Sequence, residues 1–122
     1  MKIRIKGNSL RIRLSRSEVE KLAREGLLEE ETSFATNSLL YTLQTIPGGD
    51  DLSADYIENK ITMYVPASLI KDWPENELVG FDAIMPLRDT ASLYLLLEKD
   101  FVCTRENSED QSDNFENPNK TC

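Results

Sequence analysis

The chain begins with two short stretches, residues 2–6 and 9–14, in which apolar and polar positions alternate. Alternation with a period of two is typical of a strand that buries one face. Gly7 and Asn8 lie between the stretches, and they suit a tight turn because glycine tolerates the positive φ that two-residue hairpin loops require. The pattern therefore predicts an antiparallel N-terminal hairpin.

A two-residue turn also fixes the register of this hairpin, so that Ile5 would face Leu10 and Arg4 would face Arg11. Every apolar residue then falls on one face. Every base falls on the other face, namely Lys2, Arg4, Lys6, Arg11 and Arg13.

Like charges that oppose one another directly destabilise a strand pair, so this basic face needs a neutralising partner. In one interpretation the face is solvated or pairs with acids of neighbouring strands, for which the acidic triplet at residues 29–31 is the nearest candidate in sequence. In the other interpretation the face cradles an anion, which is a phosphate, a nucleotide or an acidic segment of another chain. The candidate anion-binding residues are Arg4, Lys6, Arg11 and Arg13.

A helix is predicted over residues 16–25. Ser15 is placed as its N-cap, and Glu18 follows three residues later as a capping box requires. Val19 and Leu22 begin an apolar stripe at helical spacing, and Gly26 is suited to end the helix in a left-handed turn.

Further strands are predicted over residues 38–46 and 78–85, with a second hairpin around Glu58 and Asn59, and a short helix after Pro66. Residues 92–101 form the most apolar run, which fits either a buried strand or a short helix. We therefore expect one α+β domain over residues 1–103. It would have a mostly antiparallel sheet of about six or seven strands packed against two short helices, with curling toward a barrel as an alternative.

The charge is unevenly distributed along the chain, which has a formal net charge of −8 over 122 residues. Residues 1–17 contain six bases and no acid, whereas the remaining residues contain eight bases and 22 acids. This overall acidity argues against a general nucleic-acid binder, and no apolar run approaches the length of a membrane span. Without a leader-like apolar run, we expect a cytoplasmic protein.

The sequence contains no histidine, which excludes a Ser-His-Asp or Cys-His nucleophile system and a histidine-containing zinc site. We identify no catalytic residue, no metal ligand set and no cofactor motif. Cys103 and Cys122 do not make a disulfide scaffold, and in a reducing compartment they are expected to stay free thiols.

Residues 104–122 form an acidic polar tail with a single aromatic residue. Taken alone, such a segment is disordered. Alternatively the tail docks on the domain through Asp110, Asp113 and Phe115, which would bring the two aspartates near Arg4, Arg11 or Arg13. A tether raises the effective concentration of such a contact.

Three segments of the chain resemble a family of small uncharacterised bacterial proteins, a domain of unknown function. They are residues 1–9 (MKIRIKGNS), residues 95–101 (LLLEKDF) and residues 109–114 (EDQSDN), with Asn117, Pro118 and Cys122 beyond them. The resemblance implies a bacterial cytoplasmic protein in which the tail belongs to the natural chain. It implies no activity, cofactor or catalytic residue.

These observations favour a non-enzymatic binding or interaction module, whose partner is an unknown protein or a small anionic ligand; they leave the oligomeric state open. The alternative is binding, with or without hydrolysis, of a phosphorylated small molecule on the basic face, where Glu58 or Glu98 would hold a divalent ion. A third hypothesis is a switch in which the acidic tail covers the basic face until a partner displaces it.

Overall fold

The N-terminal hairpin has the predicted register. In a computed structural model, which describes residues 1–101 and 112–116, β1 (Lys2–Ile5) pairs antiparallel with β2 (Ser9–Leu14). Arg4 lies opposite Arg11, as expected, and Gly7 has a φ of 55° in the turn. Local alternation and the turn residue were sufficient to place this element.

The first sheet contains β1 and β2 together with the last two strands, β7 (Gly80–Pro86) and β8 (Ser92–Lys99), in the order β1-β2-β8-β7. β7 and β8 are antiparallel, but β2 and β8 run parallel at the centre of the sheet. Residues 92–99 are therefore a strand, which resolves the choice between strand and helix.

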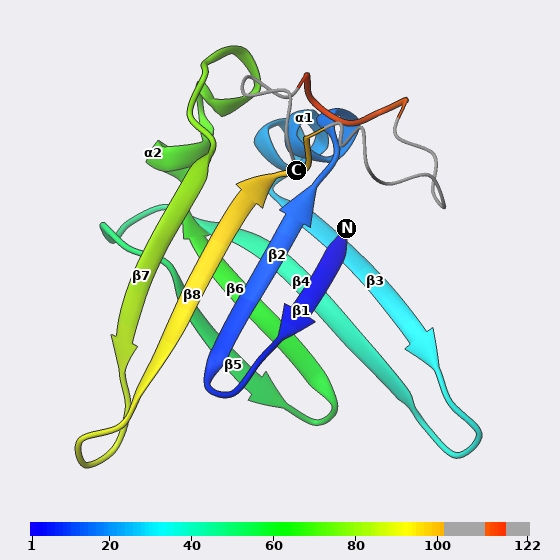
Figure 1. Cartoon of the computed structure of the whole chain (residues 1–122), viewed down its shortest axis with the longest axis vertical. Coiled ribbons are helices and arrows are strands. Elements are labelled where there is room, and N and C mark those ends of the chain that lie inside the picture. Colours follow the sequence, from blue (N-terminus) through cyan, green and yellow to red (C-terminus); the bar gives the residue numbers. More distant parts are fainter. Residues whose placement is uncertain (102–111, 117–122) are drawn as a thin grey trace.

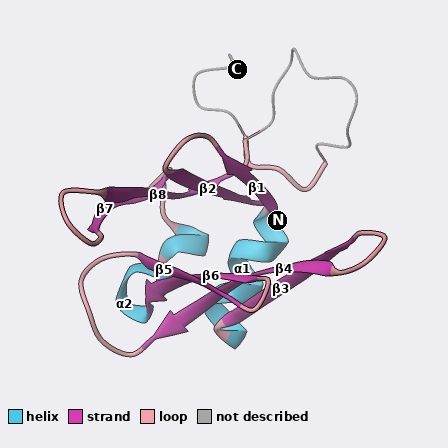
Figure 2. Cartoon of the chain, turned by 90° about the horizontal axis from the view of Figure 1, so that it is seen from below, coloured by secondary structure: helices cyan, strands magenta, loops and turns pink. Residues whose placement is uncertain are grey.

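The second sheet consists of β3 (Leu27–Ser33), β4 (Ser38–Ile46), β5 (Ser53–Ile57) and β6 (Lys60–Pro66), in the order β3-β4-β6-β5. Here too the outer pairs are antiparallel, and the central pair, β4 and β6, is parallel. The two sheets form the two layers seen in Figure 2.

The predicted α+β class with a β-rich body and two short helices is confirmed, but the predicted sheet was wrong in its finer features. The described residues form eight strands in two mixed sheets, not one mostly antiparallel sheet of six or seven strands, and these sheets do not close into a barrel. Alternation along a strand shows which face is buried, whereas it does not show which strand lies beside it or in which direction that strand runs.

The helical segments lie at one end of the two layers (Figures 1 and 2). They are α1 (Arg16–Glu25), α2 (Ala67–Ile70) and the 3₁₀ turn η1 (Trp73–Glu75). The capping box at the start of α1 is confirmed, as is the left-handed C-cap at Gly26, which has a φ of 76°. Among the described residues, no helix has both the length and the apolar character needed to cross a bilayer.

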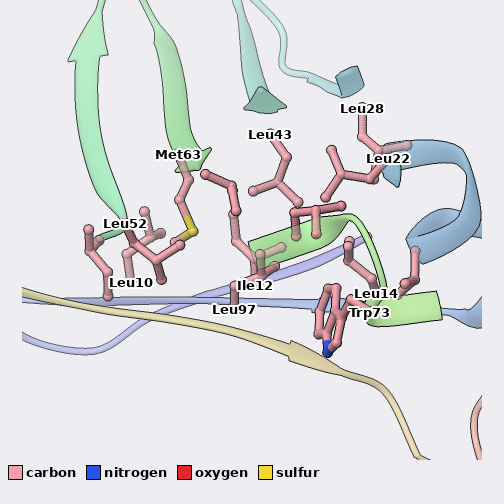
Figure 3. Close-up of a cluster of buried hydrophobic side chains, with 14 of the residues drawn as sticks. Leu10, Ile12, Leu14, Leu22, Leu28, Leu43, Leu52, Met63, Trp73 and Leu97 are labelled. Carbon is pink, nitrogen blue, oxygen red and sulfur yellow. The ribbon is translucent and has the colours of Figure 1, made fainter. Parts of the chain in front are cut away.

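The core lies between the inner faces of the sheets and is closed at the helical end by α1 and η1 (Figure 3). Leu14 lies beside Trp73 there, Leu22 lies nearer Leu28, and Leu14, Leu22 and Trp73 are fully buried. The Trp73 Nε1 donates a hydrogen bond to the Leu78 carbonyl at 2.8 Å, so this large side chain is buried with its polar atom satisfied.

The chain repeats one unit, a hairpin, a helical segment and a second hairpin, in its two halves. The repeat makes each strand of the first half, β1 to β4, equivalent to one strand of the second half, β5 to β8, in chain order. Replacing each strand by its equivalent turns the first sheet into β5-β6-β4-β3, which is the second sheet read from its other edge. Each sheet therefore contains one hairpin from each half, and the parallel pair is the seam at which the halves join.

The repeat holds at the level of single hydrogen bonds. The carbonyl of Asn8, in the first hairpin turn, accepts from the Tyr94 amide at 3.1 Å. The carbonyl of Asn59, in the corresponding turn between β5 and β6, accepts from the Leu40 amide at 3.0 Å. Equivalent core positions also agree, because Val19 and Leu22 correspond to the buried Ile70 and Trp73.

Candidate functional site

The bases of the N-terminal hairpin lie on the outer surface of the first sheet. Ile12 and Leu14 of β2 are fully buried, and the side chains between them point away from the core. We call this surface the basic face; it consists of Lys2, Arg4, Lys6, Arg11 and Arg13.

Glu98 neutralises part of the basic face. Its Oε1 accepts a hydrogen bond from the Arg11 Nε at 2.6 Å and from the Arg13 Nε at 2.8 Å. The parallel pairing of β2 with β8 places Arg13 directly beside Glu98. One carboxylate thus serves two guanidinium groups, which leaves this cluster with a net positive charge.

The two ends of the basic face differ. Lys2 pairs with Asp100, with 2.7 Å between Nζ and Oδ2, near the helical end. At the turn end, neither Arg4 nor Lys6 makes an ion pair within residues 1–101 and 112–116. Uncompensated charge is therefore concentrated beside the hairpin turn.

The acidic triplet at residues 29–31 does not serve as the partner of the basic face within the described residues. It lies on β3, in the other sheet, where the Glu29 carboxylate pairs with Lys60 at 3.3 Å. The hydrogen bonds of Glu29 with Lys60 and Thr42 lower its pKa. Glu30 binds the N-terminal ammonium group at 3.2 Å. Nearness in sequence was thus a poor guide to pairing, because the triplet follows a helix that leads into the second layer.

A hollow of about 290 Å³ lies at the turn end of the basic face. Its charged walls are Arg4, Lys6 and Arg11, and its apolar floor contains Tyr94 and Leu96 of β8. These residues come together because Arg4 opposes Arg11 on one side, and Arg11 opposes Leu96 across the parallel seam. The hollow therefore offers three cations and an aromatic ring to one ligand.

The pKa of the Tyr94 hydroxyl is raised in this hollow. Its hydroxyl donates to the Asp82 Oδ2 at 3.3 Å. Desolvation raises the pKa of Tyr94, and the neighbouring Asp82 carboxylate raises it further. The Tyr94 ring lines the hollow and can stack against a ligand there.

Two tail residues among those described contact the domain at its helical end. The main-chain carbonyl of Asp113 accepts from the Arg16 amide at 2.8 Å, and its carboxylate accepts from the Ser17 hydroxyl and amide at the start of α1. These hydrogen bonds lower the pKa of Asp113. The contact lies at the N-terminus of α1, where Asp113 and Arg13 line the same hollow. Of the three arginines named as possible neighbours, Arg4 and Arg11 do not line this hollow.

Phe115 inserts beside Asp113 and is 6% exposed. Its ring centroid lies 6.0 Å from that of Phe101, and the Arg16 guanidinium stands 4.6 Å above the ring. The Phe115 amide donates to the Asp100 carbonyl at 2.8 Å. Asp110, Cys103 and Cys122 lie outside the described residues.

Lys99 is a buried cation that sequence reasoning missed. It is 4% exposed, its Nζ donates to the Asn76 carbonyl at 2.7 Å, and the same nitrogen lies 4.8 Å from the centroid of the Phe115 ring. Burial lowers the pKa of Lys99, and the neighbouring Arg16 charge lowers it further, against an opposing contribution from Glu77. Nothing in the local sequence distinguishes this lysine from a solvated one.

The acids suggested for a divalent ion do not meet. Glu58 lies in the turn between β5 and β6 of the second sheet, whereas Glu98 lies in the first sheet and is bound to two arginines. In the part of the chain that the structure describes, no three cysteine, aspartate or glutamate side chains are grouped so as to hold a metal ion.

The basic hollow could be found only in part from the sequence. The hairpin pattern identified Arg4, Lys6 and Arg11, because their alternation is local. Tyr94 and Leu96 were missed because they are more than 80 residues away in sequence and arrive through a parallel pairing. No sequence pattern predicted the parallel pairing of β2 with β8.

Comparison with known proteins gives a family and no activity. No curated protein matches the chain, and no solved structure matches it. The model of a family of unknown function, DUF7009, matches residues 1–119, which is nearly the whole chain. The chain therefore belongs to the DUF7009 family.

Proposed function

We propose that this protein is a non-enzymatic binding module that takes an anionic partner on its basic face. The observation that supports this most strongly is the hollow at the turn end, where Arg4 and Lys6 make no ion pair among the described residues. Arg4 and Arg11 are directly opposed, and opposed like charges destabilise a strand pair. Bases that served only solubility would be more favourable if they were spaced apart on the surface.

An acidic segment of a partner protein suits this surface best. The bases follow two neighbouring strands and lie on an open sheet face, so an extended acidic chain could meet several of them at once. Guanidinium groups also bind carboxylates in a bidentate geometry that fixes orientation. Such partly solvated pairs would give specificity and fast association more than great affinity.

A phosphorylated small molecule is the second candidate. The hollow of about 290 Å³ is the observation in its favour, because Arg4, Lys6 and Arg11 could surround one phosphate while the Tyr94 ring contacts an apolar part of the ligand. We propose binding without hydrolysis, since the acids suggested for a metal ion lie on different sheets.

Calorimetric titration with a short polyglutamate peptide and, separately, with pyrophosphate tests the proposal. We expect wild type to bind one or both at low ionic strength, and Arg4→Glu to weaken that binding about tenfold. Lys21→Glu, which makes the same change of sign on an exposed position of α1, is the matched control and should leave the affinity within a factor of two. Equal loss in the two variants would show that only net charge matters.

A further inference from the structure

The two sheets are separated by an apolar cleft at the end opposite the helices. Its volume is about 600 Å³, within the range of pockets that hold small organic ligands. At the helical end α1 and η1 fill the space between the layers. Within residues 1–101 and 112–116, no corresponding helix or strand lies at the hairpin end (Figure 1).

The lining of the cleft includes three pairs of apolar side chains that the internal repeat relates. Ile5 corresponds to Tyr56, Leu10 to Ile61, and Leu39 to Leu93. Ile5 and Tyr56 are 61% and 63% exposed, which is unusual for large apolar side chains that point to the inside of a sandwich. They lie on β1 and β5, which are edge strands of the two different sheets, and we call these two side chains the lips of the cleft.

The cleft and the basic hollow are neighbours. Ser9 and Leu10 line both of them. The start of β2 therefore separates the apolar cleft on the inner face of the sheet from the basic hollow on its outer face. A molecule with its apolar part between the sheets would need to pass only the hairpin turn at Gly7 and Asn8 to reach Lys6. The thickness of one strand separates the two environments.

From this arrangement we infer that the cleft binds the hydrocarbon chain of a single-chain anionic amphiphile, such as a fatty carboxylate, whose headgroup lies against Lys6 and Arg4. The apolar side chains of the lining select the chain. Lys6 and Arg4, which make no ion pair within the described residues, select the charge of the headgroup. This inference rests on the proposed anionic partner for the position of the headgroup, and it adds the apolar half of the ligand.

A chain-length series tests whether the chain is buried. Octanoate, decanoate and dodecanoate, each below its micelle-forming concentration, are titrated into the full-length protein by calorimetry. If each methylene group enters the cleft, the affinity rises about threefold to fourfold per added methylene. Affinities that do not depend on chain length would overturn the inference, and they would leave the binding of pyrophosphate or polyglutamate unaffected.

Headgroup charge is tested with 1-decanol and decyltrimethylammonium as probes of matched length. We expect decanoate to bind at least fivefold more tightly than either. Equal affinity for decanoate and decanol would overturn the assignment of the headgroup to Lys6 and Arg4. Lys6→Glu should remove the preference for decanoate, whereas Lys21→Glu on α1 should preserve it.

The position of the chain is tested at the lips of the cleft. Ile5→Glu and Tyr56→Glu should each weaken decanoate binding more than fivefold, and because both residues are exposed these variants should fold. Leu27→Glu is the matched control, since Leu27 is an exposed apolar residue at the helical end of β3 and does not line the cleft. An equal effect of all three variants would overturn the inference. The inference would also be overturned if the wild type bound no amphiphile but formed a dimer that Ile5→Glu abolishes. The cleft would then be an interface with a second copy of the chain.

Discussion

Arg4 and Arg11 lie directly opposite each other on the outer surface of the first sheet, and they differ in what they bind. Arg11 donates to Glu98, whereas Arg4 makes no ion pair with any described residue. Within the described residues, the cost of opposing two cations is therefore only partly offset. A ligand that binds Arg4 would offset the remainder.

Replacement of Arg4 should stabilise the protein while it weakens anion binding. Arg4→Thr removes the opposed like charge and adds a residue that favours strands, so we expect the free energy of unfolding to rise by about 0.5 kcal/mol. Urea denaturation measures this change. A loss of stability would show that Arg4 makes a stabilising contact instead. Arg11→Thr is the control, and it should not stabilise because it removes a hydrogen bond to Glu98.

Glu98 should contribute to stability because it serves two arginines at once. Glu98→Gln leaves Arg11 and Arg13 without their shared carboxylate, and we expect it to lower the free energy of unfolding by about 1 kcal/mol. The partial exposure of both arginines keeps the expected loss small. Thermal and urea unfolding measure it, and an unchanged midpoint would mean that solvent replaces the carboxylate at no cost.

Docking of the described tail segment should weaken in acid. The pKa of Asp113 is lowered in the folded protein, so its carboxylate stabilises docking above its ordinary value of 3.8, and this contribution is lost as the pH falls through the folded value. The carboxylate is exposed, which limits its effect to about 0.5 kcal/mol.

At neutral pH, Asp113→Asn should remove the contribution of the carboxylate, as protonation of Asp113 does in acid. Hydrogen exchange of the Phe115 amide, which donates to Asp100, should become about twofold faster in the variant. Unchanged exchange would show that Phe115 alone holds the segment in place.

Lys99 should make stability rise with pH. Because its pKa is lowered in the folded protein, the folded state loses this proton before the unfolded state does, and the penalty of burying the charge disappears as the pH approaches the ordinary value of 10.5. Relative to Lys99→Met, the free energy of unfolding of wild type should therefore increase between pH 7 and pH 10. Parallel profiles for the two proteins would contradict this account.

Gly80 permits the close approach of β7 to β8. A Cβ at this position would lie 2.2 Å from the Leu97 carbonyl oxygen, and the main chain there cannot yield cheaply. Gly80→Ala should lower the free energy of unfolding by about 2 kcal/mol. Gly48→Ala, where a Cβ meets nothing within 4 Å, is the matched control and should change stability by less than about 0.5 kcal/mol.

The sequence was sufficient for elements that depend on neighbouring residues. The first hairpin and the capped helix α1 were predicted with their register and ends, because turn residues, alternation and caps act within a few positions. The same local pattern identified Arg4, Lys6 and Arg11 as one cationic surface.

The sequence did not predict which distant strands pair with one another. The parallel pairs β2–β8 and β4–β6 link the two halves of the chain, and alternation does not encode them. The internal repeat was also missed, because corresponding positions such as Ile12 and Met63 share apolar character and not identity. Glu98, Tyr94 and the apolar cleft all depend on these long-range pairings.

The most direct test of an anion-binding basic face is the affinity of Glu98→Gln for a short polyglutamate peptide. Removing the face's own carboxylate should increase the affinity about threefold over wild type at low ionic strength, although the variant is less stable. Arg4→Glu should decrease it, and Lys21→Glu should leave it nearly unchanged. An affinity for Glu98→Gln equal to or below that of wild type would contradict the account, because an anion on this face must compete with Glu98.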